Sequence, residues 1–174
     1  MLGTWTEKFN RQWFECVTSQ AVSRAGGALN CETHAWRSCN LDGLILDRNA
    51  VWEAKHTGAF TKSDEVLERY MPQLQHNMAV AKTDLAVLSV LFGNHKFEIF
   101  EVASDWVYQL ELLEAELDFW DCVQTGRKPT TYLAPPSPKP IGIREVCLEG
   151  NNAWASAAAD WIGLRDAAAP PGTT

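Results

Sequence analysis

The sequence predicts an α/β (α+β) protein in which a central sheet is flanked by helices. Apolar residues recur at helical spacing in the segments 5–22, 64–82 and 104–126. Between these segments lie pairs of short apolar runs, each pair joined by a turn-like sequence, and we predict that these runs form strands. The chain has 174 residues, which is enough for one such domain with a proper core.

The first helical segment, 5–22, carries a stripe of aromatic side chains and is predicted to end at Gly26-Gly27. Glu7 lies off this stripe, so by residue type alone it is a solvated helix charge. Residues 29–36 are predicted to form a short strand or an extended segment that leads into a hairpin.

Residues 40–55 are predicted to form a hairpin whose two apolar runs are joined by a turn at 47–49. Alternation in the second run puts Glu53 and Lys55 on the same face. A loop of two or of four residues would place Asp42 directly opposite Glu53 on that face, with Cβ atoms about 5 Å apart. An odd-length loop or a bulge would shift this pairing by one residue.

Two carboxylates and a lysine on one hairpin face are typical of a site that binds a metal and a phosphate. The alternative is a solvated polar face, which antiparallel sheets commonly present to water. The flanking residues favour a buried hairpin, because both of its faces carry apolar side chains. These are Leu44, Ile45, Leu46, Val51 and Trp52. Buried ionised side chains are costly unless they are paired or coordinate a cation.

The net charge of −7 argues against a protein that holds nucleic acid on a generally basic surface. It does not exclude a nuclease whose DNA contacts are confined to a groove with a few Lys and Arg residues. The longest apolar run, 85–92, is too short to span a bilayer, and no secretion signal opens the chain. We therefore expect a cytoplasmic protein with no membrane association.

The cysteines are odd in number and scattered, which suits reduced thiols. Cys31, His34 and Cys39 are close enough in sequence to be considered as a zinc site. Their spacing, C-x2-H-x4-C, lacks a fourth partner and matches no standard structural site.

The helical segment 64–82 has an apolar stripe on one face. Pro72 is predicted either to start a new helix there or to kink a continuous one. The opposite face is polar and carries Arg69, Gln73, His76 and Asn77, with Tyr70 at its margin.

Strands 85–92 and 96–102, joined by the turn signal Gly93-Asn94, are predicted to extend the sheet. Ser104 is predicted to cap the next helix. Asp105 is favourable in its first turn, and Gly126 is predicted to end it. Three regions follow from this pattern: a core domain over 1–126, a proline-rich connector over 127–150 with an isolated strand at 141–147, and an Ala-rich helix with a disordered tail over 151–174.

In order and type, these elements resemble the YqaJ-like viral recombinase family of the PD-(D/E)XK nuclease superfamily. The resemblance covers roughly residues 2–125 and rests on four motifs in the same order. The motifs are G-x3-E at Gly3 and Glu7, Asp-Gly-Leu at Asp42, Gly43 and Leu44, E-x-K at Glu53 and Lys55, and Tyr-x2-Gln-x-Gln at Tyr70, Gln73 and Gln75.

The resemblance implies a restriction-endonuclease-like core with a central mixed sheet. It also implies an exonuclease that digests linear double-stranded DNA, most simply from the 5′ end, in the cytoplasm of a bacterium or phage-infected host. A single-strand annealing recombinase is the implied partner, and a homotrimer the implied assembly. Three alternatives stay open: another PD-(D/E)XK endonuclease, a non-catalytic nuclease-fold remnant that binds DNA or a partner, and a small acidic scaffold.

The resemblance further implies roles for individual residues. Mg²⁺, or Mn²⁺ in its place, would be held by Asp42, Glu53, Glu7 and the backbone carbonyl of Ala54. Besides the two hairpin carboxylates, the catalytic residues would be Lys55, which orients or deprotonates the attacking water, and Gln73, which positions that water or Lys55. The DNA would be contacted by Arg69, Tyr70, Gln75, His76 and Asn77.

Overall fold

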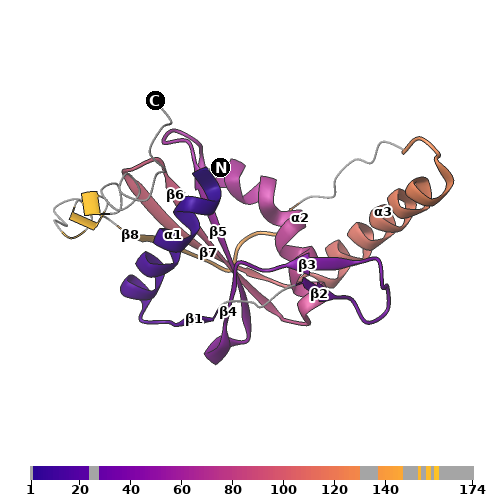
Figure 1. The fold of residues 1–174 in the computed structure, drawn as a ribbon, viewed down its shortest axis with the longest axis horizontal. Coiled ribbons are helices and arrows are strands. Elements are labelled where there is room, and N and C mark those ends of the chain that lie inside the picture. The colour runs from indigo at the N-terminus through magenta and orange to yellow at the C-terminus, as the bar shows by residue number, and fades with distance from the viewer. Residues whose placement is uncertain are drawn as a thin grey trace, which may run out of the picture.

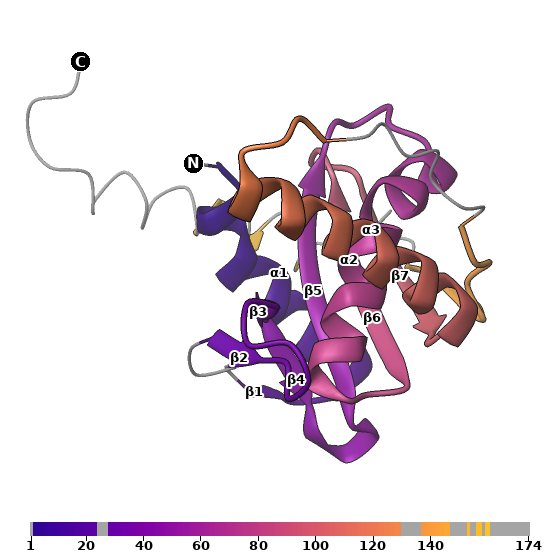
Figure 2. The same cartoon turned by 90° about the vertical axis from the view of Figure 1, so that its right-hand side faces the viewer.

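A mixed sheet with helices on both faces is the centre of the computed structural model (Figures 1 and 2). The structure describes residues 2–23, 28–129 and 137–146, together with residues 153, 156, 157, 159 and 160. Within these residues the main sheet has six strands in the order β1-β4-β5-β6-β7-β8, and β2 and β3 form a separate pair. This arrangement confirms the predicted fold class.

The elements have the following bounds. The helices are α1 (Leu2–Thr18), α2 (Ser63–Ala81) and α3 (Trp106–Thr125), with a 3-10 turn, η1, at Leu46–Arg48. The strands are β1 (Val22–Ser23), β2 (Ala28–Asn30), β3 (Ser38–Asn40), β4 (Gly43–Ile45), β5 (Ala50–Thr57), β6 (Leu85–Phe92), β7 (Lys96–Ala103) and β8 (Gly142–Val146).

Aromatic packing holds α1 against one face of the sheet. Phe14 of α1 lies against Trp52 of β5, with ring centroids 5.8 Å apart. The helix ends at Thr18, well before the predicted Gly26-Gly27, because Ser19 adopts the left-handed conformation at φ 59° while its N–H donates to the Glu15 carbonyl at 2.9 Å. A left-handed residue directly after the last turn is a common way to end a helix, here without a glycine.

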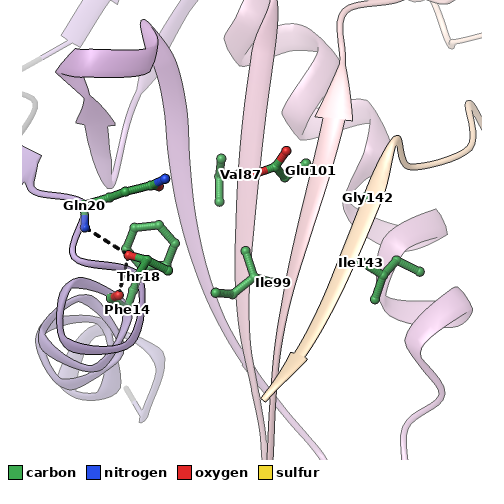
Figure 3. A pocket seen from close by; sticks show the side chains of 8 residues that line it. All are labelled: Phe14, Thr18, Gln20, Val87, Ile99, Glu101, Gly142 and Ile143. Carbon is green, nitrogen blue, oxygen red and sulfur yellow. Dashed lines mark hydrogen bonds between the residues drawn. The ribbon is translucent and has the colours of Figure 1, made fainter.

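A cavity of about 150 Å³ opens on the α1 side of the sheet, next to β7 and β8 (Figure 3). Its lining is mostly apolar and includes Phe14, Val87 and Ile99. Its carboxylate, Glu101, is in an ion pair with Arg48. The cavity therefore offers no uncommitted acid or base for chemistry.

The predicted hairpin forms with its four-residue loop, Leu46 to Asn49, closed by η1. Gly43 pairs with Trp52, so the register places Asp42 opposite Glu53, as the even-length loop requires. Asn49 adopts the left-handed conformation at φ 46° to close the turn. The hairpin register, and with it the shared face of the two carboxylates, is confirmed.

Gly43 is required by close packing at this hairpin. A Cβ atom added there would lie 2.3 Å from Cγ1 of Val22 and 3.0 Å from the carbonyl oxygen of Ser23. We expect Gly43→Ala to lower the free energy of unfolding by about 1–3 kcal/mol, because β1 must move away from β4. Urea unfolding measures this change. Gly58→Ala is the control because its Cβ would meet only a side-chain hydroxyl, at 3.3 Å; equal effects in both variants would contradict the packing explanation.

The α2 helix connects β5 to the parallel strand β6 and covers the other face of the sheet. It runs continuously through Pro72, so of the two predicted alternatives the structure has the single helix. The predicted strands at 85–92 and 96–102 are confirmed as the antiparallel pair β6 and β7, and β7 extends one residue further.

Several local predictions are wrong. Of the segment 29–36, expected to be a short strand or extended, only the start is a strand, because β2 ends at Asn30 and residues 31–37 turn back so that β3 pairs with β2. Asp105, not Ser104, caps α3, since its carboxylate accepts the N–H groups of Val107 and Tyr108 at 3.0 Å. The backbone N–H of Ser104 instead donates to Asp84.

The strand predicted at 141–147 is present as β8, but it is not isolated, because it pairs antiparallel with β7. This long-range pairing covers the edge of β7, which a local sequence pattern cannot reveal. Two predicted regions lie partly outside the described residues: the proline-rich connector at 130–136 and most of the region 147–174.

No helix within the described ranges is long and apolar enough to cross a membrane. In the same part of the chain, Cys16, Cys31, Cys39 and Cys122 are free thiols.

Candidate active site

A buried glutamate, Glu53, is the centre of the candidate site. Its side chain is only 1% exposed, yet both carboxylate oxygens have donors. Lys55 and the Gln73 amide donate to Oε1, the latter at 2.8 Å, and the Asn77 amide donates to Oε2 at 3.3 Å. The arrangement compensates a buried charge with three polar groups from two elements.

The local structure explains why these groups meet. In β5, Trp52 faces the aromatic cluster under α1, while Val51 packs in the core under α2, so alternation turns Glu53 and Lys55 toward α2. The predicted shared face of Glu53 and Lys55 is therefore confirmed.

The helix supplies its amides from neighbouring turns. Gln73 and Asn77 are four residues apart in α2, so they lie on the same side of the helix. Both amides meet the carboxylate of Glu53. Asn77 was expected to contact DNA, but its side chain is only 3% exposed and is bonded to Glu53 instead.

Asp42 joins the cluster from the neighbouring strand end. Its Oδ2 accepts the backbone N–H of Ala54 at 2.9 Å, which holds the carboxylate beside β5. Burial, followed by the negative charge of Asp42, raises the pKa of Glu53 from its ordinary 4.5 to about 7, although Lys55 opposes the shift. The charge of Asp42 thus disfavours the ionised form of Glu53.

This raised pKa predicts a pH-dependent stability. Between pH 4.5 and about 7 the folded protein holds the Glu53 proton that the unfolded chain has lost. The Glu53 contribution to the free energy of unfolding is therefore full at low pH and is lost as pH rises toward 7. We expect Glu53→Gln to become more stable relative to the wild type as pH rises from 5 to 8.

Urea unfolding in EDTA at several pH values measures the difference between the two proteins. Using the difference removes the contributions of groups common to both. A difference that stays constant across this pH range would show that Glu53 has no raised pKa in the folded state.

Lys55 is held from two directions. Its ammonium lies 4.9 Å from the centre of the Tyr70 ring and donates to Glu53. Its carbonyl accepts from the Asn10 amide of α1 at 3.2 Å. The Tyr70 ring thus helps to position the lysine, and the expected DNA contact of Tyr70 stays a prediction.

Sequence reasoning missed the support that Asn10 provides. The Asn10 amide also donates to the Ser89 carbonyl at 2.9 Å, and the Ser89 hydroxyl donates back at 2.6 Å. These bonds tie α1 to β5 and β6 beneath the site. A usable signal was present, because Ser89 is the lone polar residue in the strand LAVLSVLF.

Other predicted site residues are placed elsewhere. Gln75 is fully buried and bonds to the carbonyl of Ala103 and the N–H of Asp105, so it has a structural role and not the expected DNA contact. His76 is held between Glu116 and the Ser38 carbonyl. Arg69 is exposed on α2.

The donor set suits a hard divalent cation at Asp42 and Glu53. Carboxylate oxygens are the ligands such cations prefer, and a cation there would compensate both the burial of Glu53 and the nearby charge of Asp42, which raise the Glu53 pKa. Glu7 belongs to α1, whose aromatic side chains pack on the opposite face of the sheet, and its expected place in the metal site stays a prediction. Within the described residues, no three His, Cys, Asp or Glu side chains gather as a metal site, the trio Cys31, His34 and Cys39 included.

The fold is a mixed α/β sheet with helices on both faces, and the D…E-x-K cluster lies on β5 and directly before β4. Residues 1–84 match the model of the YqaJ-like viral recombinase domain, which confirms the family resemblance of the sequence motifs.

The chain is 28% identical over 134 residues to the uncharacterized protein YqaJ of Bacillus subtilis (strain 168), an alignment that covers 73% of this chain. The chain spans 42% of that relative's length. Among solved structures, "Crystal structure of SSO0001" is similar with a TM-score of 0.46 and 15% identity, covering 75% of this chain and 62% of that one.

Proposed function

We propose that this protein is a Mg²⁺-dependent deoxyribonuclease that hydrolyses the phosphodiester bonds of linear double-stranded DNA from the 5′ end. The observation that carries the proposal is the buried Glu53, which interacts with Asp42, Lys55 and two α2 amides. An ion pair between Glu53 and Lys55 with only a structural role would not need a second carboxylate, Asp42, close enough to raise the pKa of Glu53. The family match supports the same general role.

In this proposal Asp42, Glu53 and the Ala54 carbonyl would hold Mg²⁺, or Mn²⁺ in its place, with Glu7 contributing through water. The bound cation would supply Lewis acidity toward the scissile phosphate. The Asp42 carboxylate already has one oxygen fixed by the Ala54 N–H, so its orientation is set before a ligand arrives. The site would therefore be preorganised.

The protein's own groups would handle the water and the substrate. Lys55, steered by Glu53 and the Tyr70 ring, would orient the attacking water or accept its proton. Gln73 would keep Glu53 in place while Lys55 moves. Arg69, exposed on the same helix, would contact backbone phosphates without reading the sequence of bases.

The proposal also includes assembly. The family resemblance implies a homotrimer that works with a single-strand annealing recombinase, and both belong to the proposal. Light scattering of the purified chain measures its assembly state directly.

Cleavage of linear and circular duplex DNA of one sequence tests the function. We expect Mg²⁺-dependent loss of 5′-labelled nucleotides from the linear form, no cleavage of the circle, and complete inhibition by EDTA. Equal cleavage of the circle would favour an endonuclease of the same fold. DNA binding without cleavage would favour a non-catalytic remnant, and activity in EDTA would refute the metal mechanism.

A further inference from the structure

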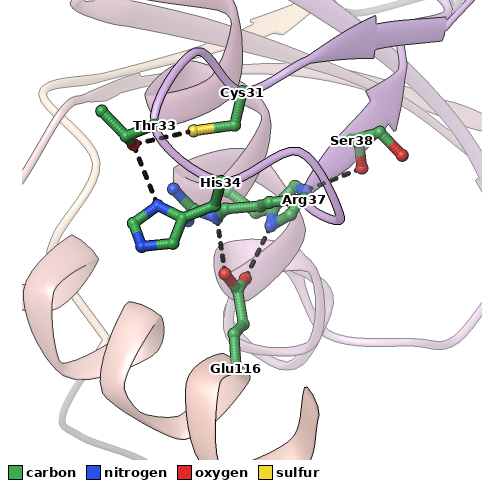
Figure 4. A network of polar contacts seen from close by, with 7 residues as sticks. Cys31, Thr33, His34, Arg37, Ser38 and Glu116 are labelled. Carbon is green, nitrogen blue, oxygen red and sulfur yellow. Dashed lines mark hydrogen bonds and ion pairs between the residues drawn. The ribbon is translucent and has the colours of Figure 1, made fainter. Parts of the chain in front are cut away.

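The ring of His76, in α2, connects three elements. Its Nδ1 lies 2.6 Å from Oε1 of Glu116 in α3, and its Nε2 lies 3.1 Å from the backbone carbonyl oxygen of Ser38 at the start of β3. The Glu116 carboxylate also accepts from Nε of Arg37 at 2.5 Å (Figure 4). One histidine thus joins α2 both to α3 and to the β2–β3 pair.

The partners of His76 determine its protonation state. A carboxylate bonded to Arg37 and a backbone carbonyl can only accept, so both ring nitrogens must carry a proton to satisfy them. The two contacts therefore exist together only in the imidazolium form. In agreement with this geometry, the hydrogen bond to Glu116 raises the pKa of His76 above its ordinary 6.5, although burial opposes the shift.

The charges around the ring allow it to titrate within the folded protein. Among the residues that the structure describes, the charged groups that act on the ring are Glu116 from α3 and Arg37 from the chain before β3, which disfavours its protonation. The α2 residues one turn away carry no charge; they are Pro72, Gln73, Ala79 and Val80. When His76 loses its proton, Glu116 keeps Arg37 as its partner, so no carboxylate is left buried without a cation.

The neutral ring can satisfy only one of its two partners. It has a single N–H, and the negative carboxylate of Glu116 is the stronger acceptor, so the proton stays on Nδ1. Nε2 then presents a lone pair to the Ser38 carbonyl oxygen, and this contact is repulsive. Because 23% of the His76 side chain is exposed, water can replace the lost partner. Loss of the proton therefore breaks the contact with β3 and leaves the contact with α3.

The β2–β3 pair depends on such attachments. It is separate from the main sheet, and a lone two-stranded sheet is marginally stable in water. Leu29 and Cys39 pack it against the core under α2, and His76 bonds its backbone at Ser38. Since β3 ends at Asn40, a looser β3 would also loosen the chain that leads to the candidate site.

We propose that His76 is a pH-dependent link between α2 and β3: the protonated ring holds β3 in place, and the neutral ring releases it. The link is complete below the ordinary pKa of histidine, 6.5, and is lost as pH rises through the raised pKa of the folded protein. This link does not depend on the proposed nuclease activity, and its failure would leave that proposal unchanged.

Hydrogen exchange of the full chain in EDTA, followed by mass spectrometry, tests the link against His76→Gln, whose side chain does not titrate. After correction for intrinsic exchange rates, the quantity of interest is the protection of residues 28–41 in the wild type relative to the variant. We expect this ratio to fall about fivefold from about pH 5.5 to about pH 9, the effect of one hydrogen bond. Glu53 and Cys31 also titrate in this range, but the ratio cancels them because both proteins contain them.

Two further variants separate the link from a general effect of pH. His95→Gln is the matched control, because it makes the same change at an exposed histidine outside α2 and is expected to keep the wild-type pH dependence. Glu116→Gln removes the negative partner and is expected to move the midpoint of the His76 NMR titration about one pH unit lower. This titration needs no substitution of His76 itself.

The proposal is overturned if the protection ratio stays constant with pH, or if His95→Gln removes the pH dependence as His76→Gln does. It is also overturned if the His76 midpoint is the same in the wild type and in Glu116→Gln, since the ring would then not be held by the carboxylate.

Discussion

Glu53→Gln is expected to reduce cleavage of linear duplex DNA by about 1000-fold or more, which corresponds to about 4 kcal/mol of lost transition-state stabilisation. Glutamine keeps the size of Glu53 and an acceptor for Gln73 or Asn77. It removes the negative charge that pairs with Lys55 and that would hold the cation. Release of acid-soluble nucleotides from linear DNA measures the effect.

Glu68→Gln is the matched control for this experiment. Glu68 is an exposed residue of α2, so the same change there removes one charge without touching the cluster. It is expected to leave the cleavage rate within about twofold, since surface charges contribute little. Full activity in Glu53→Gln would remove Glu53 from the catalytic machinery.

Trp52→Ala is expected to lower the free energy of unfolding by about 3–5 kcal/mol. Trp52 is fully buried under α1, where it contacts Phe14 and lies close to Gly43. Its removal leaves a cavity that the paired strands β4 and β5 cannot close. Its buried indole N–H has no partner among the described residues, which offsets a small part of the loss.

Urea unfolding at one pH measures this difference, and Trp106→Ala is the control. Trp106 is 76% exposed, so its replacement is expected to change the free energy of unfolding by about 0.5 kcal/mol or less. Similar losses in the two variants would mean that Trp52 is not the core residue described here.

The central part of the candidate site could be predicted from the sequence because it depends on local geometry. The period of two in a strand puts Glu53 and Lys55 on one side, and an even-length loop brings Asp42 opposite Glu53. The apolar residues around them indicate burial, which is the condition for a raised pKa. Helix contacts could not be predicted in the same way, because they depend on how α2 lies across the sheet.

Residue type was a poor guide to exposed and buried positions on the helices. Gln75 and Asn77 look like surface polar residues, yet both are buried and bonded to protein groups. Helix α3 shows the reverse, since its apolar side chains, expected from their spacing to form a packing face, are exposed at Trp106 and Leu110. Amphipathic periodicity identifies a helix, but not which neighbour covers each face.

By itself the sequence determined the α/β class, the main hairpins, the register of Asp42 against Glu53 and the family resemblance, because each depends on short-range alternation, turn length or motif order. Only the tertiary structure decided that Glu53 is bonded by Gln73 and Asn77, that Asn10 of α1 is tied to β5 and β6, and that β8 completes the sheet. These features join residues far apart in the chain, and their geometry exists only after the helices pack on the sheet.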